Sequence, residues 1–285
     1  MQWIEVFKAV LFGIIEGITE WLPVSSTGHM ILLDEFVTLN LSEQFKSLFI
    51  VVIQLGAIFA VVLLFWQNIW PFPKKFNPAT GKKQITVDKS IIDLWLKILV
   101  GCVPAGIIGL LFDEQIDALF YNYRTVAIML ILVGIAFIII ENYNKNRRAK
   151  IVRSDQITYK IALIIGVFQL IAAVLPGTSR SGATILGGIL IGLSRTLAAE
   201  FTFYLAIPVM FGASALKMFK MDYSLMGAVE WTTLLVGMLV AFAVSYLIIN
   251  FLMNYIRKND FKVFGFYRIA LGILVLLYFS FFNVN

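Results

Sequence analysis

The chain has 285 residues, of which 60% are apolar and only 14% are charged, and its mean hydropathy is +0.89. Soluble domains average about 45–50% apolar and about 25% charged residues, so this composition excludes a water-soluble globule. At roughly 20 residues per bilayer crossing, the apolar residues suffice for up to about eight spans. A single cysteine, Cys102, excludes an intrachain disulfide, and a single histidine, His29, excludes a multi-histidine metal cage. The net charge of +6 lies in short segments between apolar runs, where it sets membrane orientation and does not indicate binding to nucleic acid.

Apolar runs divide the chain along its whole length. They cover 6–24, 47–66, 91–112, 125–140, 161–175, 183–193, 201–216, 231–256 and 269–282. Backbone groups in hydrocarbon need internal partners, and the runs lack the roughly ten-residue alternation of a membrane barrel, so each is expected to be helical. The first run meets no small-residue cleavage site before Pro23, which predicts that it is retained. The sequence therefore predicts an all-α polytopic integral membrane protein with a single membrane domain over 1–285.

Charged segments predict the orientation of the helices. Segments 67–90, 141–160 and 254–268 are rich in Lys and Arg, whereas 34–46 and 113–124 are net acidic. Because basic loops stay on the cytoplasmic side, the first three are expected inside and the other two outside. Membrane topology and contact with lipid head groups suffice to explain the basic segments.

Two stretches do not fit as simple spans. Residues 9–39 and 161–195 each combine a short apolar helix, a turn rich in Pro, Ser, Thr and Gly, and a second short apolar helix. Arms of about 11–16 residues are too short to cross a bilayer. Since irregular backbone at membrane depth must be buried in protein or line a wet cavity, each stretch is expected to be a re-entrant hairpin with a functional tip.

The two hairpins also resemble each other in sequence. An offset of 153 places Gly13 on Gly166, Glu16 on Gln169, Glu20 on Ala173, Leu22 on Leu175, Pro23 on Pro176, Ser25 on Thr178 and Ser26 on Ser179. Opposite flanking charges predict that the copies enter from opposite faces, as inverted-topology repeats over about 1–140 and about 155–285. Such repeats bring both tips together near the midplane.

The first hairpin carries two carboxylates. Glu16 and Glu20 lie four residues apart, so on a helix they share one face. Two close carboxylates repel unless a cation or a shared proton relieves them, and oxygen ligands favour Mg²⁺ or Ca²⁺. A divalent metal site at Glu16 and Glu20 is therefore expected; the alternative is a pair that only hydrogen-bonds a neighbouring helix.

The second hairpin carries an arginine among hydroxyl groups. Four hydroxyl residues surround Arg180 and precede or begin a helix: Thr178, Ser179, Ser181 and Thr184. Close backbone donors, a helix N-terminus and a bidentate cation together favour an anion, which predicts a phosphate cradle. The alternative is a helix cap whose arginine reaches the interface.

His29 follows three hydroxyl residues, Ser25, Ser26 and Thr27. A lone histidine is commonly structural, but a hydroxyl becomes a useful nucleophile when a base takes its proton. These neighbours favour a catalytic pair of Ser26 with His29.

Together these motifs resemble a known family. Glu-x-x-x-Glu followed by Pro-Val-Ser-Ser-Thr-Gly-His-Met, and Pro-Gly-Thr-Ser-Arg-Ser-Gly-Ala-Thr in the second half, resemble the bacitracin-resistance type undecaprenyl-diphosphate phosphatases. The resemblance extends over nearly the whole chain, including Val52–Ala57 and Glu200–Phe203. It implies hydrolysis of undecaprenyl diphosphate to the monophosphate and phosphate in a bacterial plasma membrane, which recycles the lipid carrier of peptidoglycan synthesis and confers bacitracin resistance. The residues it assigns to the site are Glu16, Glu20, Ser25, Ser26, Thr27, His29, Ser179, Arg180, Ser181 and Thr184.

The expected mechanism uses both hairpins, in a site open to the outside. Ser26 attacks the terminal phosphorus or orients the attacking water, His29 takes the proton, and Arg180 holds the phosphoryl oxygens, while a cation at Glu16 and Glu20 shields the diphosphate. The alternative is a transporter or flippase for a lipid phosphate, because inverted repeats with broken helices are typical of carriers. That alternative leaves Ser26 and His29 without a task.

Several points stay open at this stage. A homodimer and lipid translocation alongside hydrolysis are both compatible with the sequence. Gln54 and Glu200 receive no role.

Overall fold

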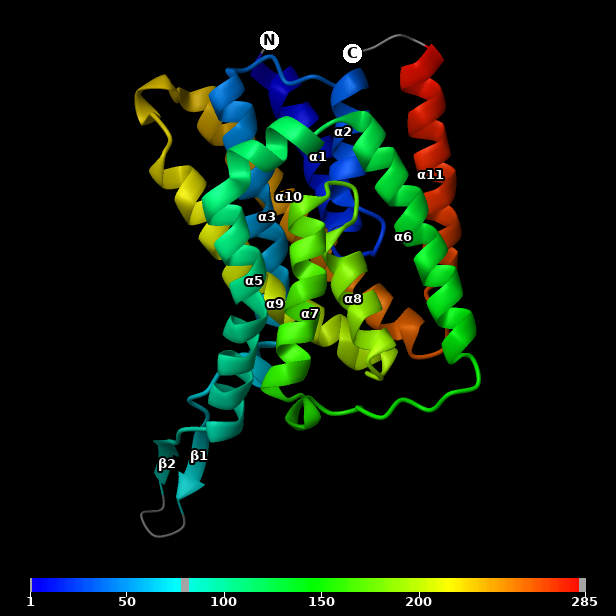
Figure 1. Ribbon diagram of the computed structural model, residues 1–285. Helices are drawn as coiled ribbons and strands as arrows, with labels where there is room; N and C mark the ends of the chain where they lie inside the picture. Colours follow the sequence, from blue (N-terminus) through cyan, green and yellow to red (C-terminus); the bar gives the residue numbers. More distant parts are fainter. Residues whose placement is uncertain (1, 78–81, 282–285) are drawn as a thin grey trace.

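The computed structural model describes residues 2–77 and 82–281 (Figure 1). In chain order its elements are α1 (Gln2–Thr19), α2 (Ser26–Phe36), α3 (Glu43–Leu64), α4 (Trp66–Ile69), β1 (Lys74–Asn77), β2 (Lys82–Ile85), α5 (Lys89–Phe120), α6 (Tyr123–Asn144), the 3-10 turn η1 (Ser154–Gln156), α7 (Tyr159–Val174), α8 (Arg180–Leu190), α9 (Arg195–Phe219), the 3-10 turn η2 (Tyr223–Leu225), α10 (Ala228–Ile256) and α11 (Lys262–Phe281). The start of the first predicted repeat (residue 1), part of the basic segment 67–90 (residues 78–81) and the end of the second predicted repeat (residues 282–285) lie outside the described residues.

Helices dominate, and within the described part of the chain six are long and apolar enough to cross a membrane: α3, α5 over Lys89–Phe112, α6, α9, α10 and α11. The prediction of an all-α polytopic membrane protein is confirmed. The upper figure of eight spans is not reached, because much of the remaining apolar sequence lies in the shorter helices α2, α7 and α8, of 11, 16 and 11 residues.

One element was not predicted. Strands β1 and β2 pair antiparallel, from Lys74 opposite Ile85 to Asn77 opposite Lys82. Each strand has four residues, and every position of β2 is exposed, so no buried face marks it in the sequence. The hairpin projects from one end of the helical body (Figure 1).

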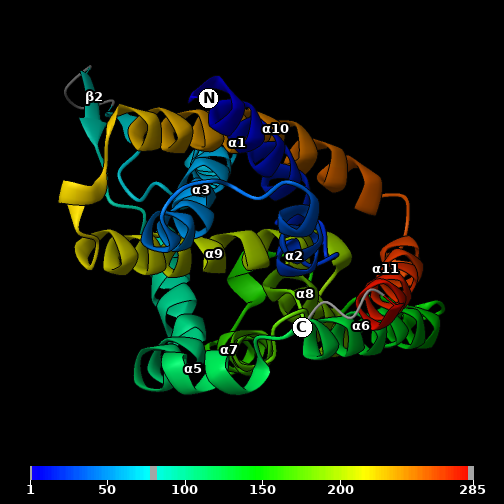
Figure 2. The same cartoon turned by 90° about the horizontal axis from the view of Figure 1, so that it is seen from above.

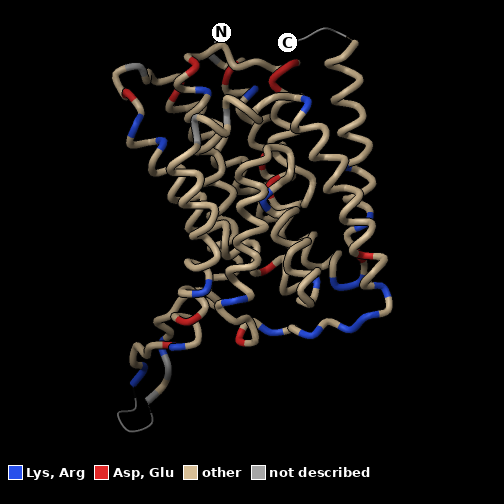
Figure 3. The backbone as a smooth tube through the Cα atoms, in the orientation of Figure 1, with Lys and Arg blue, Asp and Glu red and all other residues tan. Residues whose placement is uncertain are grey.

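In each of two pairs of short helices, the second helix runs back toward the end of the molecule at which the first helix begins (Figure 1). α1 and α2 have their outer ends where the N-terminus lies, whereas α7 and α8 have theirs at the opposite end, near the β-hairpin (Figure 1). The connecting turns of both pairs lie between these two ends. Figure 3 shows that Lys and Arg line the connection between α6 and α7 at the β-hairpin end.

Each first arm packs on a long helix from the other half of the chain. α1 packs on α10 and α7 on α5, while α6 packs on α11 and α3 on α9 (Figure 2). A Cβ placed on Gly13 would lie 2.7 Å from the carbonyl oxygen of Gly237, and one on Gly166 would lie 2.3 Å from that of Gly101. Small residues let membrane helices approach this closely, so glycine fixes both crossings.

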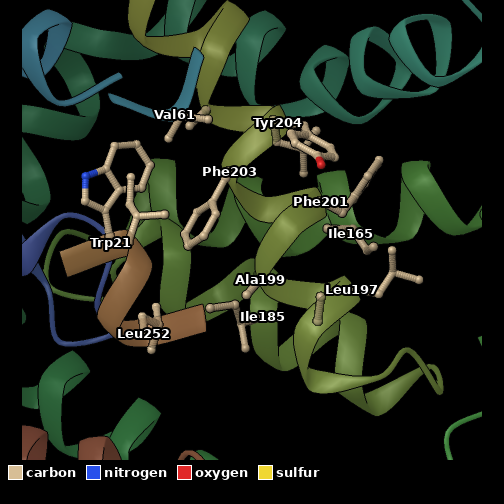
Figure 4. Close-up of a cluster of buried hydrophobic side chains, with 14 of the residues drawn as sticks. Trp21, Val61, Ile165, Ile185, Leu197, Ala199, Phe201, Phe203, Tyr204 and Leu252 are labelled. Carbon is tan, nitrogen blue, oxygen red and sulfur yellow. The ribbon is translucent and has the colours of Figure 1, made fainter. Parts of the chain in front are cut away.

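The core surrounds α9, which carries the buried side chains Phe201, Phe203 and Tyr204 (Figure 4). Trp21, fully buried, meets Phe203 edge-on with ring centroids 5.3 Å apart. Such an aromatic contact fixes the backbone at the end of α1. The core therefore holds in place the residue that directly follows Glu20.

Candidate active site

Both hairpin turns end in a serine that caps the next helix. Ser25 caps α2 and accepts from the amide of Gly28 at 3.4 Å, and Ser179 caps α8 and accepts from the amide of Gly182 at 3.1 Å. Ser25 has φ 74° and Ser179 has φ 69°. This left-handed region is uncommon for residues other than glycine and clusters at functional sites. The same unusual cap therefore occurs in both halves.

The caps correct the predicted alignment of the hairpins. Ser25 and Ser179 share the same role, so the offset at the caps is 154, because the second turn has one more residue between its proline and its serine cap. The pairing of Ser25 with Thr178, predicted from the offset of 153, is therefore wrong. Ser26 and Arg180 become equivalent as the first residues of α2 and α8.

These two equivalent residues meet at one carboxylate. Ser26 Oγ donates to Glu20 Oε2 at 2.7 Å, and Arg180 Nη2 donates to Glu20 Oε1 at 2.8 Å. The second guanidinium nitrogen, Nη1, donates to the carbonyl oxygen of Thr202 on α9 at 3.1 Å. Glu20 is only 7% exposed, so the ion pair that joins the hairpins lies almost entirely inside the protein.

A cavity of about 190 Å³ opens beside this ion pair. Its lining residues come from both turns, from the first residues of α2 and α8, and from α3, α7 and α9: Glu20, Ser26, Thr27, Gln54, Ala172, Pro176, Gly177, Ser179, Arg180, Val209, Met210 and Ala213. Gln54, which had no predicted role, contributes an amide from α3. Its signal in the sequence is a polar side chain within an otherwise apolar run.

His29 does not bond to Ser26. Its Nδ1 lies 2.7 Å from the carbonyl oxygen of Ser25, and its Nε2 lies 2.7 Å from the hydroxyl of Tyr267, whose ring stacks on the imidazole. Because a carbonyl only accepts, Nδ1 carries the proton, and in the neutral ring Nε2 accepts from Tyr267. His29 thus braces the strained serine cap against α11, and the expected Ser26–His29 hydrogen bond is absent from the described contacts.

Glu16 lies in the last turn of α1, and Glu20 directly follows that helix. It is 1% exposed, and its Oε1 has no hydrogen-bond partner among the described residues. No group of three or more His, Cys, Asp or Glu side chains that could hold a metal occurs within the described ranges. A cation here would need other oxygen ligands in addition to the two glutamates.

Arg268 ties the two turns together. It is fully buried on α11 and donates to the carbonyl oxygens of Pro23 at 3.1 Å, Gly177 at 2.8 Å and Thr178 at 2.9 Å. The sequence interpretation placed it at the end of a basic loop, because the apolar run begins only at residue 269. The helix in fact begins at Lys262, so Arg268 lies inside it.

Comparison with known proteins identifies the family. The family model described as Bacitracin resistance protein BacA matches residues 9–274. The chain belongs to this family. It is 62% identical to the undecaprenyl-diphosphatase of Desulfitobacterium hafniense over 280 residues, 98% of each chain. It is 58% identical to undecaprenyl-diphosphatase 1 of Clostridium acetobutylicum over 98% of this chain and 99% of the relative, and 57% identical to an undecaprenyl-diphosphatase of Enterococcus faecalis over 97% and 98%. The family resemblance of the motifs is confirmed.

The structure divides the predicted site residues of this family member into two groups. Ser26, Thr27, Ser179, Arg180 and Glu20 line the cavity. The buried hydroxyl residues Ser25, Thr178, Ser181 and Thr184 do not line it, and neither do Glu16 and His29. Ser181 Oγ lies 3.1 Å from the carbonyl oxygen of Glu20, and Thr184 Oγ1 donates to the carbonyl oxygen of Arg180 at 2.8 Å. Helical periodicity turns these side chains toward the protein, where they support the turns. Glu200 also lies outside the cavity lining.

Proposed function

We propose that this chain is a membrane phosphatase that hydrolyses undecaprenyl diphosphate to undecaprenyl phosphate and inorganic phosphate. Its relatives carry the name undecaprenyl-diphosphatase. The observation that carries the proposal is the convergence of Ser26 and Arg180 on Glu20 beside a polar cavity. This activity recycles the lipid carrier of peptidoglycan synthesis and accounts for bacitracin resistance.

Glu20 is the base in this mechanism. Ser26 already donates to its carboxylate at 2.7 Å, within the reach required of a general base. Ser26 Oγ attacks the terminal phosphorus, the bridging P–O bond breaks, undecaprenyl phosphate leaves, and the serine proton passes to Glu20. A water then attacks the phosphorus, and the bond between Ser26 Oγ and phosphorus breaks. The water oxygen and both of its protons leave with the released dihydrogen phosphate, while Glu20 returns its proton to Ser26 Oγ.

Arg180 holds the phosphoryl oxygens. A diphosphate in the cavity competes with Glu20 for the guanidinium, whose planar fork suits a bidentate contact with phosphate. When the Arg180 guanidinium leaves Glu20 for the diphosphate, the carboxylate is free to take the proton of Ser26. Substrate binding and activation of the base are thereby coupled.

Glu16 and Glu20 fit a divalent cation. The buried Glu16 Oε1 lacks a partner, and Mg²⁺ is commonly held by one or two carboxylates together with substrate phosphates. Bound there, Mg²⁺ or Ca²⁺ supplies charge that offsets the diphosphate. The chain's own residues perform the proton transfer described above.

The membrane arrangement belongs to the same proposal. We infer that α1–α2 and α7–α8 are re-entrant hairpins of two inverted repeats, with the site open to the outside. The matching serine caps and the matching glycine contacts of α1 on α10 and α7 on α5 support this. So do the basic connections that gather at one end of the molecule.

Phosphate release by the purified protein in detergent tests the function. A long-chain polyprenyl diphosphate should yield inorganic phosphate and the polyprenyl monophosphate, and Glu20→Gln should abolish both products. The second candidate, a carrier for lipid phosphates, is favoured by the pairing of broken helices. Translocation of the lipid in vesicles without any phosphate release would support the carrier and contradict the phosphatase.

A further inference from the structure

A second cavity lies at the basic end of the molecule, between the ends of α6 and α8. Its volume is about 660 Å³. Ile139 and Leu190 contribute to its apolar wall, and Arg147, Arg148 and Lys150 contribute its charge. We call this cavity, with Asn144, the basic groove. It shares no lining residue with the candidate active site.

The positive charge of the basic groove is not paired with a carboxylate of the described residues. Among the described residues, no carboxylate lies within 4.0 Å of the Arg147, Arg148 or Lys150 side-chain nitrogens. Neighbouring acids already have partners of their own: Glu141 with Arg195, Asp155 with Arg153, and Asp260 with Lys262. Three cations therefore face one cavity without a paired carboxylate from the described part of the chain.

Asn144 supplies an independent sign of a missing acceptor. Asn144 lines the basic groove, and its Nδ2 is buried and has no hydrogen-bond partner among the described residues. A buried donor without a partner costs about 1–3 kcal/mol, so such groups normally meet an acceptor. A ligand oxygen in the groove would supply it.

The groove is also firmly built. The Lys150 amide donates to the carbonyl oxygen of Gly192 at 2.9 Å, and the Ser194 amide donates to that of Ile151 at 2.8 Å. These bonds fasten the basic connection to the end of α8, the helix that begins with Arg180. The backbone at Lys150 is therefore held beside the end of α8, and the side chains of Arg147, Arg148 and Lys150 are exposed at the groove.

We propose that the basic groove binds an anionic phospholipid of the leaflet at the basic end of the protein. The phosphate lies among Arg147, Arg148 and Lys150 and accepts from Asn144, and an acyl chain lies along Ile139 and Leu190, which are 61% and 49% exposed. A free phosphate ion would use the cations but not the apolar wall. This site is separate from the proposed catalytic function and does not depend on it.

Native mass spectrometry of the full-length protein in detergent tests the proposal. Phosphatidylglycerol should bind, phosphatidylcholine with the same acyl chains should bind more weakly, and glycerol 1-phosphate should not compete at matched concentration. Replacing Arg147, Arg148 and Lys150 by Gln should weaken the binding of phosphatidylglycerol by roughly 10²-fold, since each basic residue near a lipid surface contributes about fivefold to the affinity. The matched control replaces Lys74, Lys82 and Lys83, which lie on the β-hairpin and remove the same charge.

A second variant separates binding from folding. Asn144→Leu removes the unpartnered buried amide, so the lipid-free protein should melt at the same or a higher temperature, while phosphatidylglycerol should bind several-fold more weakly. An equal loss of phosphatidylglycerol binding in the groove variant and the β-hairpin control would overturn the proposal. Equal affinity of the wild type for phosphatidylglycerol and phosphatidylcholine would also overturn it. Competition by glycerol 1-phosphate would overturn it in favour of a free-phosphate site, and unchanged binding in Asn144→Leu would exclude the predicted contact.

Discussion

Neither hairpin completes the site alone. Ser26 begins α2 and Arg180 begins α8, and both side chains bond to the carboxylate of Glu20. The first residue of a helix points its side chain past the cap, so two similar turns that face each other deliver two different groups to the same place. At this one position the first turn supplies a hydroxyl and the second turn supplies a cation.

Substitution of Ser26 tests the covalent route. Ser26→Ala removes the attacking oxygen, so phosphate release should fall by roughly 10³-fold or more, as removal of a nucleophile typically does. Ser42→Ala, at the cap of α3, should cost only stability. A Ser26→Ala enzyme that retains a tenth or more of the wild-type rate would exclude a phosphoserine intermediate and favour attack by water.

Substitution of Arg180 tests the role of its planar fork. Arg180→Lys keeps the charge but loses bidentate contact, and loss of a transition-state arginine costs about 10³-fold or more. The kcat for polyprenyl diphosphate should fall accordingly, whereas Arg257→Lys at the basic end should match the wild type. Near-normal turnover of Arg180→Lys would show that a simple positive charge suffices.

Glu16 should set the affinity for a divalent ion. Removal of one ligand or its support typically costs about 10–100-fold in metal affinity, so Glu16→Gln should need a correspondingly higher concentration of Mg²⁺ or Ca²⁺ for half-maximal phosphate release. Titration of the chelated enzyme with each ion measures this. Full activity of the wild type in excess chelator would contradict the metal site.

The sequence located the side chains that meet at the cavity better than it located the partners that hold the two turns. Glu20, Ser26 and Arg180 stand in local motifs with distinctive chemistry, so they are visible without a structure. The partners of Arg268 and His29 depend on α11, which follows the first hairpin by more than 200 residues. No spacing rule places Tyr267 beside His29, because that contact exists only after the helices pack.

At the level of elements, helix ends were predicted less well than helix interiors. Apolar runs located the helices, but α5 and α11 begin in the charged segments that precede those runs, at Lys89 and Lys262. A charged residue at a membrane helix end can reach the interface while its backbone remains helical. A helix start taken from hydropathy alone therefore falls after the true start, and for α11 this placed Arg268 in a loop.

Glycine at the helix crossings should be required for stability. A Cβ on Gly166 would lie 2.3 Å from the backbone oxygen of Gly101, which cannot move without displacing α5. Overpacking of this kind costs about 1–3 kcal/mol, so Gly166→Ala should lower the melting temperature of the protein in detergent. Gly106→Ala is the matched control, because a Cβ there meets nothing within 4 Å and the helix gains about 0.5–1 kcal/mol. Equal melting temperatures for the two variants would show that the α5–α7 crossing is not tightly packed.

At the scale of the whole molecule, charge and hairpin direction agree. The basic connections lie at the end of the molecule where α7 begins and α8 ends (Figures 1 and 3). The acidic segment after α2 lies at the opposite end, where α1 begins and α2 ends. Basic loops stay in the cytoplasm, so α1–α2 should enter from the outside. The basic groove then faces the inner leaflet, where anionic lipid would meet it.

Cysteine labelling in intact cells tests this orientation. In a Cys102→Ala background, Glu43→Cys and Arg153→Cys place single thiols at side chains that are 88% and 70% exposed, so the membrane and not burial decides whether each reacts. A membrane-impermeant maleimide should modify position 43 and leave position 153 unmodified, and both should react once the cells are permeabilised. The last step shows that the inner thiol is reactive and was protected only by the membrane. Labelling at 153 with protection at 43 would reverse the topology and turn the proposed active site toward the cytoplasm, whereas labelling of both in sealed cells would mean that the basic connection between α6 and α7 does not stay inside.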